Sequence, residues 1–215
     1  MTLIDTMPSA ADPFLTDDHL DVREMVREFA LAEVAPLATA LDEEKRFPHE
    51  TIPKLAELGL LGVPWPEEVG GAGMDYRAYS IVVEELSRVC GTTGITVAAH
   101  TSLGTAPIYK FGTEEQRQRW VPQLATGEML GAFALTEAGA GSDAKMTRVT
   151  AVQDGDHWVV SGTKIYCTNG THAGTVVFTA RAGGGELGDT NNIRAFVVEK
   201  GTPGFEYGVL EDKLG

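Results

Sequence analysis

The spacing of hydrophobic residues changes near residue 130 and divides the chain into two parts. Before that point, apolar side chains recur every three or four positions, as they do on the buried face of a helix. Val22, Met25, Val26 and Phe29 form one such stripe. We expect four amphipathic helices, which begin near residues 16, 49, 75 and 113, and an irregularity in the first of them at Pro36, which lacks a backbone N–H.

Two further patterns refine the helical part. Residues 92–109 contain no Asp, Glu, Lys or Arg, so we expect a helix that is buried on most sides. Thr113 and Gln116 have the spacing of a capping box, which predicts a last helix that runs to about Leu124.

After Gly127 the pattern changes to short runs rich in β-branched and aromatic residues, separated by Gly, Asn and Asp. Turn residues at this spacing are typical of an antiparallel barrel or sandwich. We therefore expect an α+β protein with a flexible arm (1–15), an all-helical domain (16–130) and an antiparallel β-barrel domain (131–215). Strands are predicted over residues 133–136, 148–152, 157–161, 164–168, 175–180, 194–199 and 205–209.

Composition and charge narrow the class of protein. With 43% hydrophobic and 22% charged residues, the chain has the make-up of a folded domain rather than of a disordered one. Its formal net charge of −14 argues against non-specific nucleic-acid binding, which needs an excess of Lys and Arg. The sequence has neither an apolar run long enough to span a membrane nor a secretion signal, and Cys90 and Cys167 make no disulfide framework. We expect a cytoplasmic protein.

The densest candidate site is the strand-to-loop transition over residues 133–143. Its small residues offer backbone N–H groups, and Thr136 and Ser142 add hydroxyls, which together suit a phosphate or the carbonyls of a flavin ring. Gly139 and Gly141 lack the third glycine of a dinucleotide fingerprint. Taken by itself, the segment is also compatible with a tight turn at the rim of a barrel.

A second candidate segment covers residues 162–170. If 164–168 is a strand, Tyr166 and Thr168 lie on one face and Cys167 on the other. An aromatic ring and a hydroxyl two residues apart can cover and hydrogen-bond a planar heterocycle. An ordinary hairpin strand that ends in the turn Asn169-Gly170 is the other interpretation.

Together these segments resemble a known family. Thr136-Glu137-Ala138-Gly139-Ala140-Gly141-Ser142-Asp143, then Lys164 and Thr168-Asn169-Gly170, are similar to signatures of the acyl-CoA dehydrogenases, and residues 111–116, 122–128 and 200–205 agree in order and spacing. The resemblance runs from about residue 16 to 215. It implies a helical domain followed by a β-barrel domain, bound FAD, and oxidation of an acyl-CoA to a trans-2-enoyl-CoA in fatty acid metabolism. It also implies electron-transferring flavoprotein as the electron acceptor and a homotetramer in the complete enzyme.

The resemblance implies roles for single residues in the first segment. Phe133, Leu135 and Thr136 match positions that face the flavin, and Thr136 would hydrogen-bond its pyrimidine edge. Gly141 and Ser142 match the loop that meets FAD and the CoA-ester chain, so Ser142 is also a substrate-binding candidate.

In the second segment, Tyr166 matches an aromatic residue beside the isoalloxazine, and Thr168 matches a hydroxyl near flavin N5. A donor at N5 would stabilise the reduced flavin. Glu137 invites a role as the base that removes the α-proton, but in the family pattern this position belongs to the loop scaffold. Ala138 replaces the proline that is common at its position.

No catalytic residue is expected among these 215. The family's base is a Glu in a second helical domain that follows the barrel, and no residue here matches it. We expect a fragment or one subunit of a split enzyme, inactive by itself, and 211–215 resembles the short-chain bacterial members. A non-catalytic FAD- or CoA-binding subunit and a flavin oxidase or monooxygenase of the same fold remain alternatives. The histidines show no metal-ligand spacing, so no metal is expected.

Overall fold

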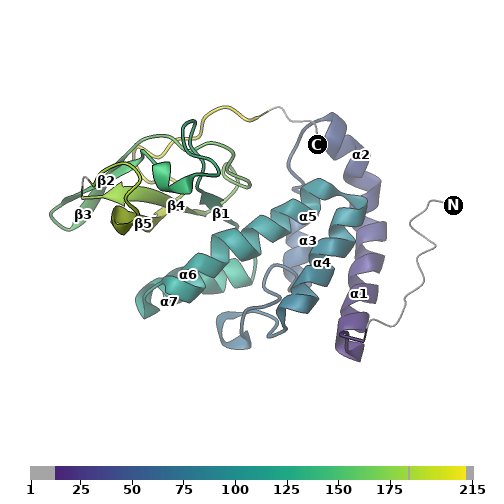
Figure 1. Cartoon of the computed structure of the whole chain (residues 1–215). Helices are drawn as coiled ribbons and strands as arrows, with labels where there is room; N and C mark the ends of the chain where they lie inside the picture. Colours follow the sequence, from purple (N-terminus) through teal and green to yellow (C-terminus); the bar gives the residue numbers. More distant parts are fainter. Residues whose placement is uncertain (1–12, 184, 212–215) are drawn as a thin grey trace.

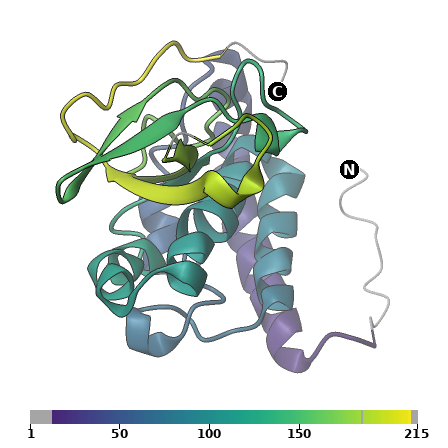
Figure 2. The same ribbon diagram turned by 60° about the vertical axis from the view of Figure 1, so that its left-hand side comes forward.

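The computed structural model describes residues 13–183 and 185–211, and it consists of a group of helices followed by a β-sheet (Figure 1). In both views the sheet lies to one side of the helices (Figure 2). The helical elements of the first part are α1 (Asp17–Phe29), η2 (Ala30–Val34), α2 (Ala35–Glu43), α3 (Ile52–Glu57), η3 (Glu67–Val69), α4 (Tyr76–Val89), α5 (Gly91–Ala98), η4 (Ala99–Thr105), α6 (Ala106–Phe111) and α7 (Glu114–Ala125).

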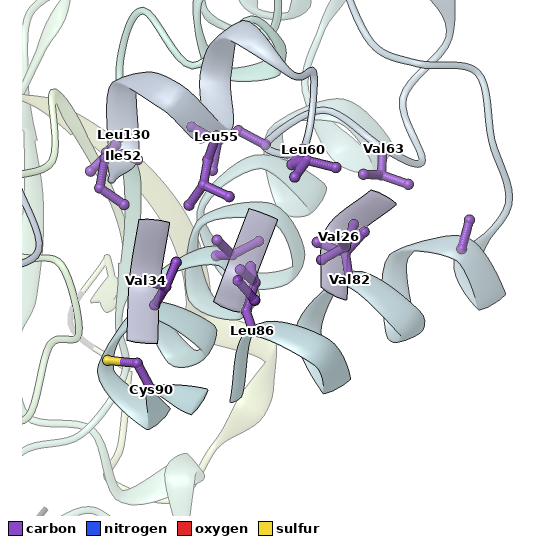
Figure 3. Packing of buried hydrophobic residues seen from close by; sticks show 14 of the residues in the cluster. Val26, Val34, Ile52, Leu55, Leu60, Val63, Val82, Leu86, Cys90 and Leu130 are labelled. Atoms are coloured by element: carbon purple, nitrogen blue, oxygen red, sulfur yellow. The ribbon is translucent and has the colours of Figure 1, made fainter. Parts of the chain in front are cut away.

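The predicted apolar stripes form the core of the helical part. Val26 of α1 packs with Val82 and Leu86 of α4, and all three are fully buried (Figure 3). Leu55 of α3 and Leu130, which precedes the sheet, join the same cluster. Burying an aliphatic side chain of this size stabilises the fold by about 1.5–3 kcal/mol, so this cluster is the main source of stability in the helical part.

Local signals set the helix starts, as expected. Asp75 caps α4, because its Oδ1 accepts hydrogen bonds from the backbone N–H groups of Arg77 (2.9 Å) and Ala78 (3.0 Å). The predicted capping box of α7 is confirmed: the N–H of Gln116 donates to Thr113 Oγ1 at 3.3 Å, and the N–H of Thr113 donates to Gln116 Oε1 at 2.9 Å.

The irregularity predicted at Pro36 is a π-helical turn, η2, directly before the proline-containing start of α2. The N–H of Ala35 donates to the carbonyl of Ala30, five residues back. The uncharged segment repeats this device: η4 precedes Pro107, and the N–H of Ala106 reaches back to Thr101. A π-turn lets the chain pass a residue that cannot donate a hydrogen bond.

The second part contains a five-stranded sheet with β4 at its centre. β5 pairs with β4 along one edge, and β1 and β2 pair with different halves of the other edge. The elements are β1 (Gly131–Ala134), η5 (Ala144–Met146), β2 (Thr150–Asp154), β3 (His157–Ser161), β4 (Thr175–Ala182), η6 (Thr190–Asn192) and β5 (Ile193–Glu199).

The expected α+β class, with helices first and a sheet after them, is confirmed, but the expected antiparallel arrangement is wrong. β1–β4 and β2–β4 are parallel pairs, whereas β2–β3 and β4–β5 are antiparallel, so the sheet is mixed. The strands expected over 164–168 and 205–209 are also absent from the described residues. Tyr166 has a φ of +56°, which ends the alternation that a strand needs.

Parts of two predictions fall outside the described residues. Of the arm expected over 1–15, only 13–15 are described, and there the carbonyl of Phe14 accepts a hydrogen bond from Arg77 at 2.8 Å. The short-chain-like motif over 211–215 is described only at Glu211. Across the described ranges, no helix combines the length and the apolar character that crossing a bilayer requires.

Candidate functional site

The two candidate segments lie side by side, although only one of them contains a strand. Phe133 is in β1, and Leu135 and Thr136 follow it directly. The N–H of Ile165 donates to the carbonyl of Thr136 at 2.8 Å, and Cys167 Sγ lies 3.6 Å from the carbonyl oxygen of Phe133. The fold therefore brings the predicted residues of 133–136 next to those of 166–168.

The loop after Thr136 turns sharply. The backbones of Glu137 and Ala140 exchange hydrogen bonds of 2.9 and 3.1 Å, and the next residues, Gly141 and Ser142, are exposed. A Cβ atom built on Gly141 would meet no atom within 4 Å. The space beside this part of the loop is open, as a ligand-binding loop requires.

Three hydroxyls of the candidate site have no hydrogen-bond partner among residues 13–183 and 185–211: those of Thr136, Ser142 and Thr168. Thr136 and Thr168 are half-buried, and Ser142 is exposed. A hydroxyl without a protein partner can donate to or accept from a ligand without first breaking a bond within the protein.

Tyr166 presents an exposed ring, with 59% of its surface accessible. Its left-handed backbone places it outside any strand, so the expected common face of Tyr166 and Thr168 loses its basis. Cys167 is half-buried, and burial raises the pKa of its thiol to about 11. At neutral pH this sulfur is therefore a thiol and a poor nucleophile.

Glu137 is buried under these loops and is fully engaged. Its carboxylate accepts hydrogen bonds from Lys164 Nζ (2.7 Å), the hydroxyl of Thr147, and the backbone N–H groups of Arg148 (2.6 Å) and Val149 (3.2 Å). Burial by itself would raise the pKa of Glu137, but these donors outweigh it and lower the pKa to about 2. A carboxylate with so low a pKa is a weak base, which agrees with the predicted scaffold role.

The contacts of Lys164 and Asn169 were not foreseen, although both residues belong to the motifs singled out above. Lys164 is the cationic partner of Glu137. Asn169 is buried with a φ of +65°, and its Nδ2 donates to the carbonyl of Thr96 in α5 at 2.9 Å. It thereby ties the end of the second segment to the helices.

An open cleft of about 480 Å³ adjoins the loop, lined by Glu137, Ala138, Gly139, Arg148, Val149, Gly162 and Thr163. None of the seven predicted flavin-facing residues lines it. The candidate site is therefore an exposed surface on another side of the loop and not a closed cavity. Within the described ranges, no three His, Cys, Asp or Glu side chains gather in a way that would hold a metal ion.

Comparison with protein families decides what this arrangement belongs to. The model of the acyl-CoA dehydrogenase N-terminal domain matches residues 16–128, and that of the acyl-CoA dehydrogenase middle domain matches residues 132–215. The chain belongs to the acyl-CoA dehydrogenase family.

Members of this family are similar to the chain over almost its whole length. A short-chain specific acyl-CoA dehydrogenase of Clostridium acetobutylicum is 48% identical over 201 residues, which cover 94% of this chain and 52% of the relative. Acyl-CoA dehydrogenase relatives of Bacillus subtilis and Bos taurus are covered to a similar extent. The chain thus spans about half the length of the curated relatives it matches.

Two solved structures of the family show the same fold. Butyryl-CoA dehydrogenase from Megasphaera elsdenii matches with a TM-score of 0.89 and 36% identity, over 94% of this chain and 53% of that one. An acyl-CoA dehydrogenase from Bacillus anthracis, solved in complex with FAD, matches with a TM-score of 0.83 and 34% identity, over 95% of this chain and 35% of that one.

The residues present fit the flavin that an acyl-CoA dehydrogenase implies. Partnerless hydroxyls, an exposed aromatic ring and an open glycine loop come from adjacent segments. A planar, polar-edged ring system needs these features: an apolar or aromatic surface for its faces and hydrogen-bonding groups for its edge.

Proposed function

We propose that this chain provides the FAD-facing part of a flavin-dependent acyl-CoA dehydrogenase that converts a short-chain acyl-CoA thioester to a trans-2-enoyl-CoA. The observation that carries the proposal is the direct junction of Thr136 with the segment that holds Tyr166 and Thr168. The acyl chain length is taken from the short-chain specific and butyryl-CoA relatives.

Within this proposal, Phe133 and Leu135 lie against the flavin, and Thr136 hydrogen-bonds its pyrimidine edge. Gly141 and Ser142 bind where the flavin meets the CoA-ester chain, and Ser142 also contacts substrate. Bound FAD would supply the acceptor for the hydride that leaves the substrate β-carbon.

Tyr166 covers one side of the ring system, and Thr168 offers its hydroxyl near N5. The support for these roles is the exposure of the tyrosine ring and the lack of a partner for the threonine hydroxyl among the described residues. Together with the loop, they would orient the flavin and exclude water from one side of it.

We further propose that the base that takes the α-proton is not among these 215 residues. Glu137 is the buried carboxylate at the site, and four donors already hold it in its ionised form. The chain by itself would then lack dehydrogenase activity. In the complete enzyme we propose a cytoplasmic homotetramer, with residues 16–130 and 131–215 as its first two domains, that passes electrons to electron-transferring flavoprotein.

An anaerobic titration tests the proposal. The 215-residue chain is purified, reconstituted with FAD and mixed with butyryl-CoA, while the visible absorbance of the flavin is followed. We expect the chain to retain FAD and the flavin to stay oxidised. Bleaching by this chain alone would show that the base lies within it, and failure to bind FAD would refute the flavin site.

The same titration with a longer protein that includes the remaining length of the relatives separates the alternatives. Bleaching without oxygen consumption supports the dehydrogenase. Rapid reoxidation by oxygen would favour an oxidase or monooxygenase, and FAD binding without bleaching would favour a non-catalytic binding subunit.

A further inference from the structure

The ammonium group of Lys164 lies at the centre of a buried polar cluster beneath the proposed flavin site. Its Nζ contacts four oxygens: Glu137 Oε1 (2.7 Å), the carbonyl of Leu135 (2.9 Å), Thr147 Oγ1 (3.0 Å) and Thr179 Oγ1 (3.3 Å). The side chains of Lys164 and Glu137 are 10% and 6% exposed. An ammonium has three N–H groups, so its hydrogen-bonding capacity is fully used.

This cluster joins four segments that are distant in sequence. Lys164 belongs to the segment 162–168, and Thr179 belongs to β4. Glu137 follows β1 and also accepts from Thr147, Arg148 and Val149, which lead into β2. A single ion pair therefore holds together most of the elements that surround the site.

The contacts of Lys164 bracket Thr136 in particular. The ammonium binds the carbonyl of Leu135 on one side of Thr136 and the carboxylate of Glu137 on the other, while the N–H of the adjacent Ile165 donates to the carbonyl of Thr136 itself. Tyr166 and Thr168 follow within four residues of Lys164. Any shift of the lysine segment would consequently move these residues relative to Thr136.

We propose that the buried Lys164–Glu137 pair is a positioning device that holds Thr136 in register with Tyr166 and Thr168. The inference rests on the proposed flavin site for its functional meaning. The pair itself does not contact the flavin in this scheme, and it acts through the backbone of the residues that do.

Hydrogen exchange in the FAD-free chain tests the positioning directly. Lys164→Met keeps a side chain of similar length and removes the ammonium. We expect the amides of Ile165 and Ala140 to exchange at least tenfold faster, with no change at Val82 and Leu86 in the helical core. Lys145→Met, which removes an exposed lysine near the same loop, is the matched control and should leave exchange unchanged. Equal exchange in Lys164→Met and the wild type would overturn the proposal.

A double variant separates positioning from simple stabilisation. Lys164→Met or Glu137→Gln leaves one buried charge unpaired, whereas the combined variant removes both charges, so part of the lost stability should return. We expect FAD to bind at least tenfold more weakly to all three variants, including the combined one. If FAD affinity instead recovers together with the melting temperature, the pair is only structural and the proposal is wrong.

These results also separate this inference from the proposed function. If the wild-type chain fails to bind FAD, the proposed flavin site is refuted, while the exchange data still decide whether the pair sets the loop register. If the wild type binds FAD and the folded variants bind it equally well, the flavin site stands and the positioning role is refuted.

Discussion

His100 accepts a hydrogen bond from the backbone N–H of Gly131 through Nδ1, at 2.9 Å, and this bond connects the helices to the first strand of the sheet. The other ring nitrogen, Nε2, lies 3.0 Å from the carbonyl of Leu124 at the end of α7. Since Nδ1 accepts, Nε2 carries the proton and donates to Leu124. A neutral, fully buried histidine thus anchors β1, from which Phe133 and the candidate loop extend.

The first prediction concerns the pH dependence of this anchor. Burial lowers the pKa of His100 to about 4, although hydrogen bonds to the carbonyls of Leu124 and Leu61 partly oppose the shift. The folded pKa lies below the unfolded value of about 6.5, so the unfolded chain takes up the proton first as the pH falls. Stability should decline by about 3 kcal/mol as the pH decreases from about 6.5 to 4, and then level off for this group.

Urea unfolding of the wild type and of His100→Gln across this pH range measures the effect. Other titrating groups are shared by the two proteins, so their contributions cancel in the comparison. The wild type should be the more stable protein at pH 7, with an advantage that shrinks toward pH 4. Parallel stability curves would contradict the assignment.

The second prediction concerns the close approach of Gly104 in η4 to Gly131 in β1. A Cβ atom on Gly104 would lie 2.4 Å from the carbonyl carbon of Gly131, so the two backbones are in contact and cannot accommodate a methyl group without moving. Gly104→Ala should destabilise the chain by about 1–3 kcal/mol through overpacking. Gly91→Ala is the control, because a Cβ there meets nothing within 4 Å, and it should cause no loss.

The third prediction concerns Asn169 in its left-handed conformation. Asn169→Gly keeps that conformation and loses the hydrogen bonds to the carbonyls of Thr96 and Gly131, so it should cost about 1–2 kcal/mol. Asn169→Asp places a buried carboxylate against the same two carbonyls and should cost about 3–5 kcal/mol.

Thermal unfolding at several pH values distinguishes the two variants. The deficit of Asn169→Asp should diminish at acidic pH, because the protonated carboxyl can donate to a carbonyl, whereas that of Asn169→Gly should not. Equal losses at every pH would mean that Asn169 acts through its backbone alone.

The fourth prediction concerns the partnerless hydroxyls. Thr136→Val and Thr168→Val remove one hydroxyl each with little change of shape, so the stability of the FAD-free chain should stay within about 0.5 kcal/mol of the wild type. Each should weaken FAD binding about tenfold, the loss expected for one hydrogen bond of about 1.4 kcal/mol. Quenching of FAD fluorescence measures the affinity, and Thr163→Val, an exposed hydroxyl of the same segment, should bind FAD like the wild type.

Features that depend on neighbouring residues could be read from the sequence. The N-cap at Asp75, the capping box of Thr113 and Gln116, and the hairpin of β2 and β3 all arise from side chains within a few positions of one another. The residues of the candidate site were also recognised from local motifs. Their geometric relationship could not be read, because it depends on the bond between Ile165 and Thr136, which are 29 positions apart.

The amino-acid sequence by itself determined the division into helices and strands, the helix starts, the buried stripes around Val26 and Val82, and the family to which the motifs point. Only the tertiary structure decided the parallel pairing of β1 and β2 with β4, the loss of the strand around Tyr166, and the burial of Lys164 against Glu137. The reason is physical. Periodicity and capping are local properties of the chain, whereas strand direction and the partner of a buried charge depend on which distant segments pack together.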